Sequence, residues 1–167
     1  MHGRKSVFIV GLLALALAAC ATQGAMTVNS GAITNPVAKY KDAMAVRTVT
    51  GGQAMNILTM PGVSNEPLKA ALESSLAANG YSARSGPPKF QIDAEIQNLD
   101  QPLIGLDMDV TAAVTYKVSS ATTSVVYPIS AKATATFSDS PIAADRVRVA
   151  NERAMQENIK QFLLALR

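Results

Sequence analysis

Four carboxylates in two alternating stretches are the first candidates for a chemical role. Asp93 and Glu95 lie two residues apart in one stretch, and Asp107 and Asp109 lie two apart in the next. Since alternate residues of a strand point to the same side of a sheet, the pairs would meet on the solvent face of a hairpin. Opposed carboxylates could hold a hard cation such as calcium, but a calcium site normally adds carbonyl groups from a shaped loop. We therefore favour solvated side chains near Lys117, and expect no metal.

Two further patterns are formally catalytic. Ser130 and Lys132 share one face of a predicted strand, as a Ser/Lys pair would. A lysine acts as a base where it is buried, whereas Lys132 is expected to be in water. The run Gly51-Gly52-Gln53 does not continue into the Gly-Lys-Ser/Thr ending of a phosphate loop. We therefore expect neither a catalytic residue nor a cofactor, and a protein that is not an enzyme.

The single cysteine and the single histidine both lie near the N-terminus. Cys20 follows an uncharged, mostly apolar run over 7–19, which Arg4 and Lys5 precede. This order is typical of a secretory signal, and the run is shorter than the ~20 residues of a membrane-spanning helix. Cleavage before Cys20 would remove His2 and lower the net charge from +3 to about +1. The remaining chain would lack histidine chemistry and disulfides, and we expect no nucleic-acid partner.

Hydrophobic periodicity predicts the strands and helices on which these residues lie. Strict alternation predicts strands, and apolar residues every three or four positions predict helices. Pro128 places the last strand at an edge of the sheet. In chain order we expect a strand over 44–50, a helix from Ser64 to Asn79-Gly80, strands over 90–97, 104–118 and 125–137, and a helix from Pro141 to Leu166. The fold class is α+β: a two-layer sandwich with a mostly antiparallel four-stranded sheet (β-α-β-β-β-α) and both helices on one face.

Polar residues of the last helix divide between its two sides. Arg146 and Arg153 are expected on the side opposite the apolar stripe. Asn151 and Asn158 fall beside the stripe, and we expect their side chains to hydrogen-bond the ends of strands.

Leu103 and Ile104 stand at the tip of a predicted hairpin, where polar residues are usual. Either they tuck under the end of the sheet, or they form an exposed apolar knuckle that contacts a partner or lipid. The polar, Thr/Ser-rich face of the sheet is a second candidate surface, suited to a polar partner or a glycan.

The sequence Leu17-Ala18-Ala19-Cys20 resembles the lipobox of bacterial lipoproteins. The resemblance implies cleavage before Cys20 and attachment of acyl chains such as palmitate to its thiol, and Ala21 implies an outer-membrane lipoprotein facing the periplasm. From about Arg47 onward the chain is similar to a family of uncharacterised bacterial lipoproteins, on the segments Val49-Thr50-Gly51-Gly52, Val63-Ser64-Asn65-Glu66, Leu99 to Gly105 and Ala150-Asn151-Glu152. More loosely it is similar to YajG-type lipoproteins and to auxiliary lipoproteins of envelope transport systems.

Similar chains have been labelled UDP-N-acetylglucosamine acyltransferase. This chain departs from that enzyme class, because it lacks hexapeptide repeats and would lose its histidine on cleavage. We expect a signal peptide over 1–19, a lipidated cysteine with a flexible tether over 20–42, and one domain over 43–167. Residues 26–34 could instead form an edge strand.

The expected function is a non-enzymatic accessory lipoprotein, bound to the membrane through its lipid and associated with an envelope protein complex. The alternatives are a lipid or glycolipid carrier, which would use space left by alanines such as Ala112 and Ala131 on the buried face of the sheet, and the acyltransferase.

Overall fold

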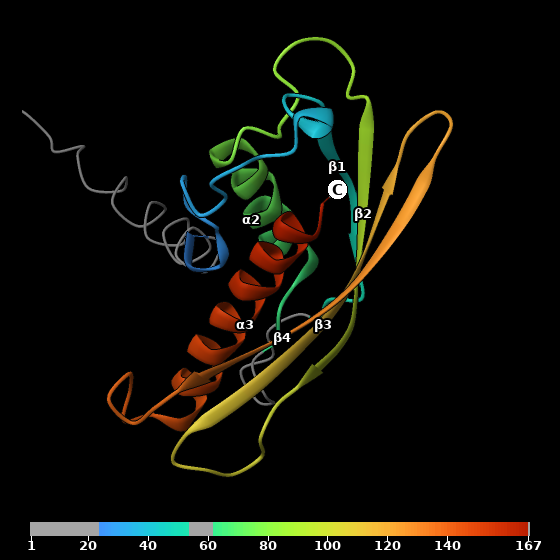
Figure 1. The fold of residues 1–167 in the computed structure, drawn as a ribbon. Helices are drawn as coiled ribbons and strands as arrows, with labels where there is room; N and C mark the ends of the chain where they lie inside the picture. Colours follow the sequence, from blue (N-terminus) through green and yellow to red (C-terminus); the bar gives the residue numbers. More distant parts are fainter. Residues whose placement is uncertain (1–23, 54–61, 167) are drawn as a thin grey trace, which may run out of the picture.

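A four-stranded sheet forms one layer of the molecule, and two helices form the other (Figure 1). The computed structural model describes residues 24–53 and 62–166. Strands lie side by side in chain order, with β1 parallel to β2 and the other pairs antiparallel. The elements are η1 (Ala38–Tyr40), β1 (Met44–Thr50), α2 (Asn65–Ala78), β2 (Phe90–Asp100), β3 (Met108–Ser119), β4 (Ser124–Ala135) and α3 (Ala143–Ala165). The predicted α+β fold class is confirmed, with both helices on one face of the sheet.

Alternation along the strands separates the core from solvent. In β3 every second residue from Met108 to Val118 is buried beneath the helices. The strand begins at Met108 rather than at Ile104, because β2 ends at Asp100 and β4 at Ala135, so that earlier residues have no backbone to pair with. Pro128, which lacks a backbone donor, lies on the edge strand β4 as predicted.

The first helix keeps its predicted limits. Helix α2 buries Leu68, Leu72 and Leu76 and ends before Gly80, whose φ of 76° is a conformation that favours glycine. A bulge in β2 between Ile96 and Asn98 faces the end of β1. A side chain on Gly51 would collide with the carbonyl of Ile96, so glycine is required for this close approach.

Helix α3 packs on β3 and β4 through a buried polar group as well as its apolar stripe. Asn158 is fully buried; its Oδ1 accepts a hydrogen bond from the Tyr116 hydroxyl at 2.8 Å, and its Nδ2 donates to the carbonyls of Ala112 and Ile129 at 2.9 and 3.0 Å. The Tyr116 ring stacks on Phe162 with centroids 4.1 Å apart. Asn158 thus bonds the strands as expected, although at their middle rather than their ends.

The segment 24–42 does not behave as the expected tether. Met26 is fully buried and Val28 nearly so. The amide of Val28 donates to Ser75 Oγ of α2 at 2.9 Å, and Gln156 of α3 donates to the carbonyl of Thr27 at 2.7 Å. The tether assignment is therefore wrong from residue 24 onward, because the segment covers both helices with Met26 and Val28 buried in the core. It adds no strand to the sheet either. The predicted signal peptide and residues 20–23 lie outside the described residues.

Candidate functional site

The loop between β2 and β3 presents apolar side chains to solvent. Leu103, Ile104 and Leu106 are 86%, 92% and 76% exposed. The alternative in which Leu103 and Ile104 tuck under the sheet is therefore wrong. Leu106, which falls within the strand predicted over 104–118, lies in the same loop.

A second loop, between β4 and α3, adds to the same end of the molecule (Figure 1). Phe137 and Ile142 are each 60% exposed. Phe137 falls within the strand predicted over 125–137, but β4 ends at Ala135, and turn-forming residues from Ser138 to Ser140 follow. That cluster of turn residues is the signal that could have placed Phe137 in a loop. We call the set Leu103, Ile104, Leu106, Phe137 and Ile142 the apolar tip.

Arg146 joins the two loops of the apolar tip. Its side chain is buried, contrary to the expected outward position, and the residue is only 4% exposed. Nη1 donates to the carbonyl of Ser140 at 2.9 Å, and Nη2 donates to the carbonyl of Gly105 at 3.4 Å. The guanidinium also lies 5.6 Å from the centre of the Phe137 ring, within the range of a cation–π contact. One cation thus contacts both loops, and this fixes the tip as a single surface.

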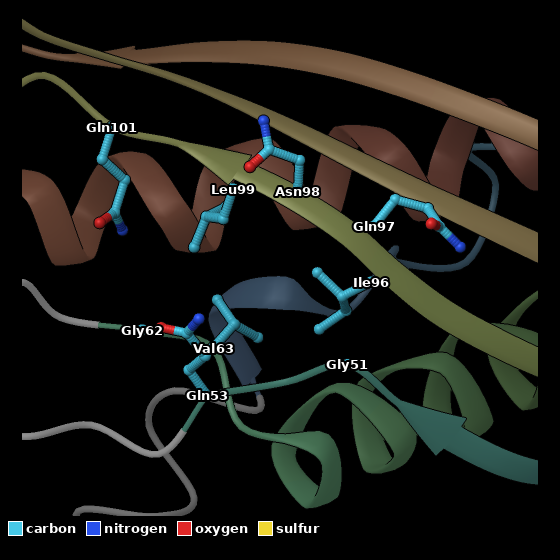
Figure 2. Close-up of a pocket in the computed structure, with 9 residues that line it drawn as sticks. All are labelled: Gly51, Gln53, Gly62, Val63, Ile96, Gln97, Asn98, Leu99 and Gln101. Carbon is cyan, nitrogen blue, oxygen red and sulfur yellow. The ribbon is translucent and has the colours of Figure 1, made fainter.

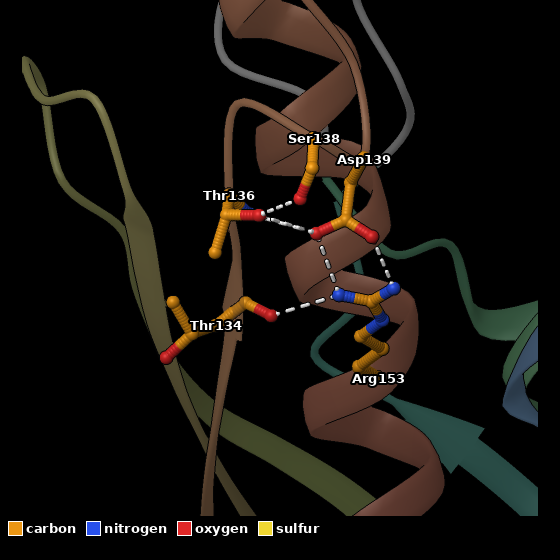
Figure 3. Close-up of polar contacts among 5 residues, drawn as sticks. All are labelled: Thr134, Thr136, Ser138, Asp139 and Arg153. Atoms are coloured by element: carbon orange, nitrogen blue, oxygen red, sulfur yellow. Dashed lines mark hydrogen bonds and ion pairs between the residues drawn. The ribbon is translucent and has the colours of Figure 1, made fainter.

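A second polar cluster holds the β4–α3 loop (Figure 3). Arg153 of α3 donates to both carboxylate oxygens of Asp139, at 2.5 and 3.0 Å, and to the carbonyl of Thr134 at 3.0 Å. The amide of Thr136 donates to Asp139 at 2.8 Å. These bonds stabilise the charged carboxylate and lower the pKa of Asp139 to about 2, with Arg153 the largest cause.

The predicted acidic cluster is divided among cationic neighbours. Asp93 forms an ion pair with Arg47 and accepts a hydrogen bond from Thr48 at 2.7 Å. Arg47 is the largest cause of the lowered pKa of Asp93. Within the described ranges, no group of three or more His, Cys, Asp and Glu side chains is arranged to hold a metal.

The next pair on that face is similar. Asp109 accepts bonds from Lys132 Nζ at 2.8 Å and Thr134 Oγ1 at 2.5 Å, and the Lys132 bond is the largest cause of its lowered pKa. Lys132 is thus solvent-exposed and paired with Asp109, which leaves Ser130 without the buried lysine that base catalysis requires.

A cleft of about 320 Å³ lies where β1 ends beside the bulge of β2 (Figure 2). Its described lining carries glutamine and asparagine amides but no charged side chain. Gly51 and Gln53 of the rejected phosphate-loop pattern form part of its wall. The Gln101 amide donates to Asn151 Oδ1 at 2.7 Å, so this amide already binds α3. The described residues that line the cleft are Gly51, Gln53, Gly62, Val63, Ile96, Gln97, Asn98, Leu99 and Gln101.

Several alanines of the sheet and of the last helix are buried in the core. Ala112 and Ala135 of the sheet and Ala150 and Ala154 of α3 are all fully buried. Because small residues let a helix approach a sheet closely, these positions reflect close packing of α3. The alanines therefore give no specific support to the carrier alternative.

Cys20 lies outside the described residues. In the part of the chain that the structure covers, none of the helices has the combined length and hydrophobicity needed to cross a bilayer.

Comparisons with known proteins find similarity in fold. No family model matches the chain, and no curated protein matches it in sequence. Among solved structures it is similar to a Xanthomonas campestris protein of the family DUF330, with a TM-score of 0.53 and 9% identity over 81% of this chain and 88% of the other. A hypothetical protein from Chlamydia trachomatis matches with a TM-score of 0.50 and 12% identity, over 75% of this chain and 94% of the other.

A candidate lipoprotein from Caulobacter crescentus matches with a TM-score of 0.49 and 13% identity, over 86% of this chain and 90% of the other. At these identities, the matches at a TM-score of 0.50 and above show that the chain has the same fold as other bacterial proteins.

Proposed function

We propose that the protein is a lipid-anchored accessory lipoprotein of the bacterial outer membrane, that it faces the periplasm, and that it acts by binding rather than by catalysis. The observation that carries the binding role is the apolar tip, with Ile104 92% exposed. Exposed apolar patches on a folded domain usually mark an interaction site.

Side-chain hydrogen bonds hold the two loops of the tip in place. Arg146 contacts both loops, and Arg153 with Asp139 fixes the second. A surface that is ordered before binding loses less conformational entropy when it binds. This supports a dedicated contact surface over a chance exposure of leucine and isoleucine.

The anchoring part of the proposal rests on the lipobox-like sequence that ends at Cys20, and the outer-membrane part rests on Ala21. Several acyl chains on one cysteine make membrane attachment effectively permanent, since each buried CH₂ contributes ~0.8 kcal/mol. The non-enzymatic part is supported by Asp93, Asp109 and Lys132, whose charges are already paired.

Two measurements on the expressed full-length protein test the proposal. Incorporation of labelled palmitate and retention in the outer-membrane fraction are expected for the wild type, and both should be lost in Cys20→Ala. A Cys20→Ala variant that remains in the outer-membrane fraction would refute the anchor.

The binding role is tested with Ile104→Cys, whose thiol is unique because Cys20 is acylated. We expect a water-soluble maleimide to label Ile104→Cys several-fold more slowly in native envelopes than in detergent. Thr122→Cys, in the exposed turn between β3 and β4, is the matched control and should label equally in both. Equal labelling of the Ile104→Cys variant in envelopes and detergent contradicts a binding role for the tip.

A further inference from the structure

We propose that the apolar tip inserts into the interface of the same bilayer that holds the lipid anchor, so that the domain contacts the membrane at two points. The inference rests on the proposed lipid anchoring and names the partner of the apolar tip as a lipid surface. It follows from the length of chain between the anchor and the folded domain, the position of the tip, and the charges around it.

The chain leaves the domain close to the anchor. Because Met26 is buried and the carbonyl of Thr27 is bonded to Gln156, the domain includes the chain almost from residue 24. Only residues 21–23 separate Cys20 from Gly24. Even fully extended, this connection spans about 14 Å between the two Cα atoms. A tether reaching to residue 42 would have let the domain lie far from the bilayer, and this connection does not.

The residue that holds Thr27 and the residue that holds the tip lie on the same helix. Gln156, which holds Thr27, and Arg146, which holds the tip, are both on α3, ten residues apart. At 1.5 Å per residue this is about 15 Å along the helix axis. A domain held by a connection of about 14 Å can therefore bring its tip to the surface that holds the anchor.

The cations near the tip argue against attraction to anionic headgroups as the driving force. Arg148 pairs with Glu152 at 3.0 Å and Arg153 pairs with Asp139, while the buried Arg146 donates to loop carbonyls. The cations described on this part of α3 are thus already engaged. Leucine, isoleucine and phenylalanine side chains partition into the interface without a charge partner. A short connection also raises the effective concentration of the tip at the bilayer, so that weak insertion is sufficient.

Depth-dependent quenching in a protein-free bilayer tests the inference. The lipidated full-length product carrying Ile104→Cys, labelled with an environment-sensitive dye, is reconstituted into vesicles of phosphatidylethanolamine and phosphatidylglycerol that contain a lipid-attached quencher. Thr122→Cys is the matched control; it is also exposed, and it lies beyond the far end of β3, about 36 Å from the strand's first residue. We expect quenching at Ile104→Cys to exceed the control several-fold, and to be unchanged in neutral phosphatidylcholine vesicles or in high salt.

A companion double variant sharpens the result. Leu103→Asp with Leu106→Asp should reduce quenching of the Ile104→Cys probe to the control value, because the inserted side chains become charged. Both positions are exposed, so a native circular dichroism spectrum is expected and excludes unfolding as the cause.

The failures of the two proposals are distinguishable. If the protein floats with vesicles but the Ile104→Cys probe is quenched no more than the control, bilayer insertion is overturned and lipid anchoring stands. If the Ile104→Cys thiol is protected from maleimide in native envelopes but its probe is unquenched in vesicles, the tip binds a protein. That result also overturns bilayer insertion. Protein that does not float with the vesicles overturns both.

Discussion

At the scale of one residue, Arg146 is a buried cation whose role is to position the two loops of the apolar tip. Its guanidinium donates to the carbonyls of Ser140 and Gly105, and its buried Nε has no partner among the described residues. Burying a cation without a carboxylate partner costs desolvation free energy, and hydrogen bonds to carbonyls offset this cost only in part. The residue instead joins two loops that the backbone hydrogen bonds of the sheet do not link.

Arg146→Met is therefore expected to reduce the order of the two loops while leaving the stability of the whole domain almost unchanged. The substitution removes a desolvated cation, and water can solvate the loop carbonyls that it leaves. The free energy of unfolding in urea should change by less than about 1 kcal/mol. Amide hydrogen exchange over 101–107 and 136–142 should nevertheless become faster, because the loops lose their shared contact.

Lys160→Met is the control for Arg146→Met, since Lys160 forms a half-exposed pair with Glu157. It should alter neither exchange in the two loops nor stability by more than about 0.5 kcal/mol. Unchanged exchange in Arg146→Met would show that the loops are ordered without this residue.

Residue types at the tip were partly predictable from sequence. Leu103 and Ile104 stand out because apolar residues are unusual at a hairpin tip. Phe137 and Arg146 were misplaced, since the periodic pattern continues through both positions. Periodicity reports which side of an element a residue takes, but it cannot report that a loop folds over the outer side and buries it.

At the scale of elements, the connection between β4 and α3 depends on one ion pair. Asp139 accepts hydrogen bonds from Arg153 and from the amide of Thr136, which lowers its pKa to about 2. An acid whose pKa is lower in the folded protein stabilises the fold above its ordinary pKa and loses this contribution as pH falls. The contribution of Asp139 should therefore disappear as pH falls from about 4 to about 2.

Proteolysis of the loop over 136–142 with an acid-active protease measures this effect. Cleavage in the wild type should rise steeply across the interval, whereas Asp139→Asn should be cleaved readily even at about pH 5 and change less with pH. Acidification also protonates Asp93 and Asp109, whose pKa values are lowered as well. Cleavage is therefore compared within the loop over 136–142 rather than as unfolding of the whole domain. A wild-type loop as sensitive at about pH 5 as that of Asp139→Asn would contradict a stabilising role for the pair.

Regular elements were predictable and the covering segment was not. Alternation predicts β2, β3 and β4, because a sheet with one buried face imposes a period of two on the sequence. The segment 24–42 carries no such period, and a linker and a covering segment have the same Thr-, Asn- and Gly-rich composition. Only its contacts with α2 and α3, which are distant in sequence, distinguish them.

Met26→Ala tests whether this segment is part of the core. Met26 is fully buried, so truncation should lower the free energy of unfolding by about 2–5 kcal/mol, as for other buried large-to-small changes. Ser30→Ala, at an exposed position of the same segment, should change it by less than about 0.5 kcal/mol. Urea denaturation of the two variants gives the comparison, and equal stabilities would mean that the segment contributes no packing.

At the scale of the whole molecule, the two ends of the domain have different surfaces. One end carries the apolar tip, while the β3–β4 turn at the other end of β3 is formed by polar residues, with Ser120 Oγ and Thr123 Oγ1 2.8 Å apart. The short connection from Cys20 would hold such a domain at the bilayer in a preferred orientation, tip inward. Orientation would thus be set jointly by the apolar tip and by the packing of residues 24–42.

Lengthening the connection tests that joint control. A flexible Gly/Ser insertion of about 20 residues after Gln23 should leave lipid anchoring intact but lower the effective concentration of the tip at the bilayer about 15-fold, by the −3/2 power of linker length. Quenching of the Ile104→Cys probe should fall accordingly. The same insertion after Ala121, in the β3–β4 turn, is the length-matched control and should leave quenching unchanged. If the insertion after Gln23 also leaves it unchanged, the tip holds the membrane by its own affinity, and the short connection contributes nothing to orientation.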